Sequence, residues 1–108
     1  MKIAIPVKGS KLTDIINERF GRSEAFIIYN DGEFKVINNE AANAPGGAGV
    51  STAQLMCDEN VEVILAMRVG PKALEVINTA EIKLYEAKAG TVAENILAFE
   101  AKNLKKCN

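Results

Sequence analysis

The sequence contains no histidine and no tryptophan, and only two of its 108 residues are cysteines. Without imidazole, the chain has no histidine general base, no Ser–His or Cys–His nucleophile pair, and no zinc site that needs histidine. Cys57 and Cys107 lie far apart, so they form neither a CxxC pair nor a disulfide framework. We therefore expect a protein of the reducing cytoplasm that uses no histidine chemistry.

Excess charge and long apolar runs are also missing. Thirteen lysines and arginines balance fourteen aspartates and glutamates, which is neither the footprint of a nucleic-acid-binding domain nor an acidic disordered tail. Apolar runs such as Val63–Met67 are far shorter than the roughly 20 residues of a membrane span, and the segment before Lys8 lacks a signal-peptide pattern. We expect no nucleic-acid partner and no membrane partner.

The 48% apolar content and the length predict one domain, residues 1–108, whose core needs no disulfide or metal. Short β-branched and apolar runs predict five strands. The Asp31-Gly32 dipeptide predicts a two-residue hairpin turn between the second and third strands. The expected strands are Lys2–Val7, Ala25–Tyr29, Phe34–Ile37, Val61–Met67 and Ile82–Tyr85.

Helix-start patterns follow the hairpin. Ser51-Thr52-Ala53-Gln54 has the form of a capping box and predicts a helix from there to about Glu59. Pro71 fits the first position of a second helix, because a missing N–H costs nothing there. Thr91-Val92-Ala93-Glu94 repeats the capping-box form and predicts a final helix. Its expected apolar side consists of Val92, Ile96, Leu97, Phe99 and Leu104.

Between the first two strands, Leu12, Ile15 and Ile16 stand three and four residues apart, which predicts one or two helical turns. The whole order is then a strand, a hairpin, and an alternation of helices with strands. A hairpin makes one strand antiparallel, and right-handed crossovers make the later strands parallel. The pattern therefore predicts a mixed five-stranded sheet covered by helices.

Several short motifs occur in a fixed order: Phe20-Gly21-Arg22, Asn38, Gly46–Gly49, Val69–Ala73 and Ile82–Tyr85. This series resembles the dinitrogenase iron-molybdenum cofactor biosynthesis family (nitrogenase accessory factor-like) over nearly the whole chain. The resemblance implies a three-layer α/β/α, ribonuclease-H-like fold with strand order 3-2-1-4-5 and strand 2 antiparallel. It also implies a domain that binds an iron–sulfur or iron–molybdenum cluster precursor, with a cluster-assembly protein as partner. Family members tend to use histidine or cysteine ligands, and this chain departs from them in having no histidine.

With that strand order, a crevice opens beyond the carboxyl ends of strands 1 and 4. Three predicted helices start at this end, and their N–H groups favour anions, as do nearby cations. We therefore expect this crevice to hold a metal cluster or a related small anion, with no catalytic residue and no side chain bonded to metal. The expected binding residues are Lys8, Gly9, Phe20, Gly21, Arg22, Asn43, Gly46, Gly47, Gly49, Arg68 and Gly70.

Other interpretations stay open. The glycine loop is also compatible with a plain crossover, and Arg22 or Arg68 with a solvated side chain or one paired with Glu24. The same loops would suit a protein-interaction or regulatory module without a cofactor. A small hydrolase would need metal-binding carboxylates, and Ile3–Val7, where ribonuclease-H-like nucleases carry them, has none.

The two cysteines receive separate expectations. Cys57 falls late in its helix, so we expect it to be buried away from the crevice. Cys107 follows Lys105 and Lys106 in a tail that we expect to be frayed, where the lysines would lower its thiol pKa.

Overall fold

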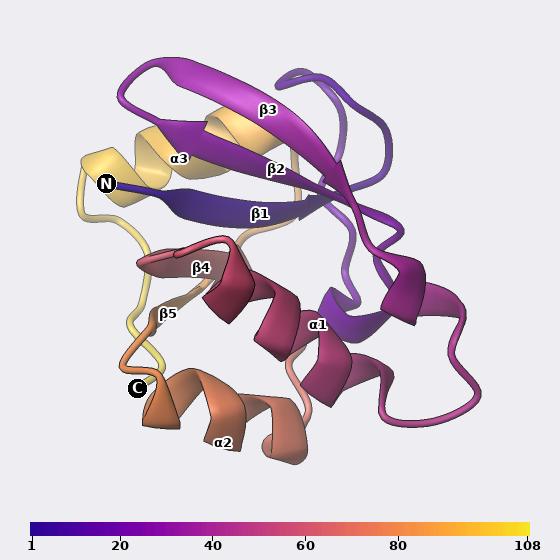
Figure 1. Ribbon diagram of the computed structural model, residues 1–108. Coiled ribbons are helices and arrows are strands. Elements are labelled where there is room, and N and C mark those ends of the chain that lie inside the picture. Colours follow the sequence, from indigo (N-terminus) through magenta and orange to yellow (C-terminus); the bar gives the residue numbers. More distant parts are fainter.

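The computed structural model describes every residue from Met1 to Asn108 and contains one mixed sheet with helices on both faces (Figure 1). Its five strands pair in the order β3-β2-β1-β4-β5. β2 runs antiparallel to both of its neighbours, while β4 is parallel to β1 and β5. The expected strand order is confirmed. The strands are β1 (Ile3–Val7), β2 (Ala25–Asn30), β3 (Glu33–Asn38), β4 (Val63–Ala66) and β5 (Lys83–Glu86).

The central strands are apolar because both of their faces are covered. Every residue of β1 and β4 is buried. At the hairpin, Asp31 and Gly32 have φ angles of 50° and 86°, and Asn30 pairs with Glu33, so the predicted two-residue turn is confirmed. β3 forms one edge of the sheet and is largely exposed.

Helices α1 (Ala48–Asp58) and α2 (Pro71–Thr79) cover one face of the sheet, and α3 (Val92–Glu100) covers the other (Figure 1). Met56 and Ile77 belong to the core under α1 and α2, whereas Ile96 belongs to the core under α3. Leu97, expected on the apolar side of α3, is instead 65% exposed. Two short 3-10 helices, η1 (Phe20–Arg22) and η2 (Glu40–Asn43), lie in the loops.

The start of α1 differs from the prediction. The helix begins at Ala48 and not at Ser51, after Gly47 in the left-handed conformation with a φ of 69°. The Ser51 N–H already bonds to the Gly47 carbonyl at 3.0 Å, so Ser51 lies inside the helix and caps nothing. Glycine reaches this conformation without steric cost, and the helix therefore starts one turn earlier.

The other two helix starts match their predictions. Pro71 occupies the first turn of α2. At α3, the Thr91 hydroxyl accepts from the Glu94 N–H at 3.1 Å, and the Glu94 carboxylate accepts from the Thr91 N–H at 3.0 Å. The capping box is thus complete.

No helix forms at Leu12, Ile15 and Ile16. The Asp14 carboxylate accepts hydrogen bonds from the N–H groups of Ser10 and Lys11, both at 2.9 Å, and so stabilises a turn. Such local side-chain bonds compete with a helix for backbone donors. The prediction of helical turns here was wrong, because the spacing of the apolar residues gave no sign of this turn.

The segment after α3 is ordered against the sheet edge and not frayed. The Glu86 N–H bonds to the Lys105 carbonyl, and the Cys107 N–H bonds to the Leu84 carbonyl, both at 2.8 Å. The Asn108 side chain accepts from the Leu84 N–H at 2.8 Å. The tail therefore covers the edge of β5. No helix in the chain combines the length and apolar character needed to cross a bilayer.

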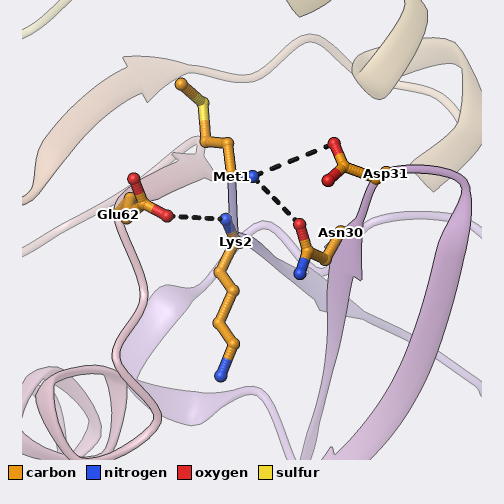
Figure 2. Close-up of polar contacts among 5 residues, drawn as sticks. All are labelled: Met1, Lys2, Asn30, Asp31 and Glu62. Carbon is orange, nitrogen blue, oxygen red and sulfur yellow. Dashed lines mark hydrogen bonds and ion pairs between the residues drawn. The ribbon is translucent and has the colours of Figure 1, made fainter.

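The end of the sheet where β1 begins is held by polar contacts (Figure 2). The Met1 amino group donates to the Asn30 side chain at 2.9 Å and forms an ion pair with Asp31 at 3.9 Å. The Lys2 N–H donates to the Glu62 carboxylate at 3.2 Å. These contacts tie β1 to the hairpin and to the residues before β4, at the end opposite the predicted site.

Candidate functional site

The loops after β1, β3 and β4, together with the segment before β2, meet at the carboxyl end of β1 and form adjacent hollows. The largest, of about 550 Å³, lies over the ends of β1 and β3, and we call it the asparagine hollow. It is lined by Val7, Lys8, Gly9, Asn17, Arg22, Glu24, Ala25, Asn38, Asn39, Glu40 and Asn43.

Two further hollows adjoin it. The arginine hollow, of about 470 Å³, is lined by Arg19, Phe20, Gly21, Arg22, Gly49, Met67, Arg68, Val69 and Gly70. The helix-start hollow, of about 350 Å³, is lined by Gly21, Arg22, Gly47, Ala48, Gly49, Val50, Gly70, Pro71, Lys72 and Ala73.

Ten of the eleven expected binding residues line these hollows, but not a single one of them. Arg22 borders all three, and Gly46 borders none. Lys8, Gly9 and Asn43 line only the asparagine hollow. The remaining six, which line the arginine or helix-start hollow, are Phe20, Gly21, Gly47, Gly49, Arg68 and Gly70.

Arg19 was missed by the sequence reasoning. Its backbone forms a parallel β-bridge with Arg68, and the Phe20 N–H bonds to the Arg68 carbonyl at 3.2 Å. Two segments far apart in the sequence thus bring two guanidinium groups to one hollow. The prediction of helical turns before β2 was incompatible with an extended pairing here, and no sequence pattern indicated a role for Arg19.

Arg22 is held by backbone carbonyls and not by Glu24. Its Nη1 donates to the carbonyl oxygens of Ala42 at 3.0 Å and Ala44 at 2.7 Å. The guanidinium has five N–H donors, so the Nε and Nη2 hydrogens stay available for other acceptors. Arg22 therefore joins η1 to η2 while keeping its charge at the junction of the hollows.

A close glycine contact fixes η1 against α1. A Cβ atom on Gly21 would lie 2.9 Å from the Gly49 Cα and 3.0 Å from its nitrogen. Only glycine permits this approach of two backbones. The motif glycine Gly21 thus serves packing, and this packing places the start of α1 beside Arg22.

A buried polar network supports the same contact. The Asn39 Nδ2 donates to the Ser23 carbonyl and to the Thr52 hydroxyl, both at 2.9 Å. The Thr52 hydroxyl donates to the Ala48 carbonyl at 2.7 Å. The three polar residues of this network, Ser23, Asn39 and Thr52, are buried. Satisfied buried networks of this kind rigidify the groups that they connect.

All three helices start at this end of the sheet, as expected, but only the N-termini of α1 and α2 line the helix-start hollow. The first backbone N–H groups of α1 and α2 have no acceptor within their helices, and Gly49 and Lys72 line the hollow. At α3 the loop after β1 accepts these donors: the Val92 N–H bonds to the Asp14 carbonyl at 3.0 Å and the Ala93 N–H to the Leu12 carbonyl at 2.8 Å. Anions are therefore favoured beside α1 and α2.

Exposed cations surround the arginine and helix-start hollows without partner carboxylates. The ion pairs of the chain join Met1 to Asp31 and Lys35 to Glu59, so none involves a residue of these hollows. No aspartate or glutamate lines either hollow. The local field is therefore positive although the chain carries a net charge of −1. The unpaired cations here are Arg19, Arg22, Arg68 and Lys72.

Neither cysteine lines any of the three hollows. Cys57 is half-buried against the core under α1. Burial raises the pKa of the Cys107 thiol and the Glu86 carboxylate raises it further, against a smaller lowering by Lys105. The expected lowering of this pKa was wrong, because desolvation and the Glu86 carboxylate of β5 outweigh the effect of Lys105.

Comparison with known families adds to this geometry. The family described as "Dinitrogenase iron-molybdenum cofactor" matches residues 1–102. The chain belongs to this family. Its dinitrogenase iron-molybdenum cofactor domain thus covers β1 to α3 and includes every residue that lines the three hollows.

Relatives of this dinitrogenase-cofactor domain share its length and fold. An uncharacterized protein of Methanocaldococcus jannaschii is 34% identical over 98% of this chain and 91% of its own length. The apo form of the orange protein from Desulfovibrio gigas superposes with a TM-score of 0.94 at 25% identity, covering 98% of this chain and 92% of that one. A Thermotoga protein described as NifB-like superposes with a TM-score of 0.85 at 36% identity, covering 97% of this chain and 91% of that one.

Proposed function

We propose that this family member is a non-enzymatic carrier that holds an anionic iron–sulfur or iron–molybdenum cluster precursor at the carboxyl ends of the central strands. The family to which the chain belongs supports a cofactor-related role. The observation that carries the proposal is the convergence of Arg19, Arg22 and Arg68 on one hollow that contains no carboxylate. An anion placed there would meet three arginines and no negatively charged side chain.

The cargo would rest over the arginine and helix-start hollows and not in the asparagine hollow. Glu24 and Glu40 line the asparagine hollow and would repel an anion. Of the residues expected to bind, Gly21, Gly49 and Gly70 would bring backbone close to the cargo. Lys8, Gly9 and Asn43 would lie at the rim or outside the site.

The chain's donor set suits a cluster that keeps its own sulfide or oxygen ligands. The sequence has no histidine, and neither cysteine lines the hollows, so contacts would be hydrogen bonds and charge. Such charge-assisted bonds are worth roughly 1.5–3 kcal/mol each. The hold would be reversible, as delivery to a cluster-assembly protein requires.

Anaerobic loading tests this function. Purified protein is incubated with iron, sulfide and molybdate, desalted, and assayed for bound metal and visible absorbance. We expect the unaltered protein to retain metal, and Arg68→Met to weaken retention by about tenfold or more, since one charge-assisted bond is lost.

Lys83→Met is the matched control, because Lys83 is exposed at the start of β5 and lines none of the three hollows. It should retain metal like the unaltered protein. An unaltered protein that stays colourless and metal-free would refute the carrier and favour the interaction module.

A further inference from the structure

The asparagine hollow has a different chemistry from its neighbours. Its lining carries Lys8 and Arg22 as well as Glu24 and Glu40, so its charges sum to zero. No ion pair joins these residues to one another. Groups of both signs thus face one space of about 550 Å³ without neutralising each other. This lining suits a ligand that itself carries both signs.

The strand register separates Lys8 from the two glutamates, whereas Arg22 is anchored on the acidic side by the carbonyls of Ala42 and Ala44. Val7, Ala25 and Asn38 lie side by side across β1, β2 and β3, and all three line the hollow. Lys8 follows Val7 directly, whereas Glu40 lies just beyond Asn38. Two strand spacings, together roughly 10 Å, therefore separate the backbones of the cationic side and the acidic side. Glu24 lies between them, next to Ala25.

Asn39 adds a buried acceptor on the acidic side. The residue is only 3% exposed, and its Nδ2 donates to Ser23 and Thr52. A flipped amide would set two acceptors, Oδ1 and the Ser23 carbonyl oxygen, against each other, so the orientation is fixed. Oδ1 receives no hydrogen bond from the protein and yet is not sealed in the interior, so it faces the surface that Asn39 lines, which comprises the asparagine hollow and a groove beside α1.

We propose that the asparagine hollow is a second binding site, for a zwitterionic small molecule of the short-peptide class. Its ammonium group would bind among Glu24, Glu40 and the Asn39 Oδ1, and its carboxylate would bind the Lys8 ammonium. An extended peptide of three residues spans about 10 Å, which matches the separation of the two sides. A simple anion would meet the two glutamates, and a simple cation would meet Lys8.

This site goes beyond the carrier function and does not depend on it. The two sites share Arg22 alone among charged residues, and its Nη1 is already bonded to Ala42 and Ala44. Arg68→Met, which lies outside the asparagine hollow, should therefore lose metal and still bind the peptide, and Lys8→Met, which lies outside the other two hollows, should still retain metal.

The test is an NMR titration of ¹⁵N-labelled protein with triglycine. Its two blocked forms, N-acetyl-triglycine without the ammonium and triglycinamide without the carboxylate, are the matched ligands. We expect saturable shifts at the amides of Gly9, Ala25 and Asn43 with triglycine, and affinities at least about tenfold weaker for each blocked form.

Variants assign the two ends of the ligand. Lys8→Met should lower the affinity for triglycine at least about tenfold while leaving the affinity for triglycinamide unchanged. Glu40→Gln should likewise lower the affinity for triglycine while leaving the affinity for N-acetyl-triglycine unchanged. The charge-matched controls Lys83→Met and Glu75→Gln, at exposed positions outside the hollow, should bind triglycine normally.

Three results would overturn the proposal. One is the absence of saturable shifts with triglycine. The second is equal binding of N-acetyl-triglycine, which would make the hollow a simple anion site. The third is a set of shifts centred on Gly49 and Gly70, which would place the peptide in the neighbouring hollows.

Discussion

At the scale of single residues, the loops around the hollows depend on one close backbone contact and on the buried polar side chains that support it. Gly21 and Gly49 touch at a distance that no side chain would allow. Asn39 and Thr52 hold the same contact from beneath. Gly21 stands out in the sequence because it belongs to a motif, whereas Asn39 has no sequence signal: its burial and its partners follow only from the fold.

Gly21→Ala should destabilise the protein by about 1–3 kcal/mol, because the new methyl group would overlap backbone atoms of Gly49 that cannot rotate away. Thermal unfolding measures the loss. Gly46→Ala is the control, since no atom lies within 4 Å of the position a Cβ would take there. Equal melting temperatures for the two variants would contradict the close contact.

Asn39→Asp should also destabilise the protein, by roughly 1–3 kcal/mol or more, since an oxygen would replace the donor that faces the Ser23 carbonyl. Denaturant unfolding at neutral pH checks this expectation. Asn38→Asp is the matched control, because Asn38 is exposed. If both variants unfolded at the same denaturant concentration, the buried network would not be stabilising.

At the scale of the elements, helix starts decide which donors reach the hollows. Gly47 lets α1 begin early and leaves its first N–H groups facing outward. The Thr91–Glu94 box and the turn at Asp14 instead close the start of α3. The capping box at Thr91 could be predicted from four residues. The early start of α1 could not, because a left-handed glycine has no fixed place in a sequence pattern.

The α3 start also gives an acid-dependent stability. Backbone hydrogen bonds from Ser10 and Lys11 lower the pKa of Asp14 below its ordinary 3.8, and bonds from Thr91 lower that of Glu94 below its ordinary 4.5. A carboxyl whose pKa is lowered by folding stabilises the protein above its unfolded pKa, and this stability is lost as pH falls through the folded pKa.

Asp14→Asn together with Glu94→Gln should therefore lower the denaturant midpoint at neutral pH. In this double variant the midpoint should also fall less steeply as the pH drops below the two ordinary pKa values. Unfolding curves across that pH range measure the slope. Glu75→Gln, at an exposed position on α2, is the control and should keep the decline of the unaltered protein. An unchanged acid slope in the double variant would contradict the assignment.

At the scale of the whole molecule, a nearly neutral chain divides its charges by place. Its two ion pairs lie outside the three hollows, while the cations at the carboxyl ends of the strands have no partner carboxylates. The strand order, and with it the meeting of these loops at the carboxyl end of β1, could be predicted from the resemblance and the alternation of elements. The division into hollows of different charge could not, because it depends on which side chains the turns before β2 and after β3 bring together.

Metal retention should accordingly fall with ionic strength, because salt shortens the screening length from about 30 Å at 0.01 M to about 3 Å at 1 M. Bound metal after anaerobic loading is measured across this range. Triglycine binding should depend less on salt, since the peptide carries no net charge. Retention that is independent of salt would argue that charge does not hold the cluster.

Arg22 is common to all three hollows, and the carbonyls of Ala42 and Ala44 anchor its guanidinium. An anion in the arginine hollow that attracted this guanidinium would leave the asparagine hollow with more negative charge. Thermodynamic reciprocity requires the second guest to affect the first by the same factor. Through this one side chain, binding in one hollow would change the affinity of the neighbouring hollow for its own ligand.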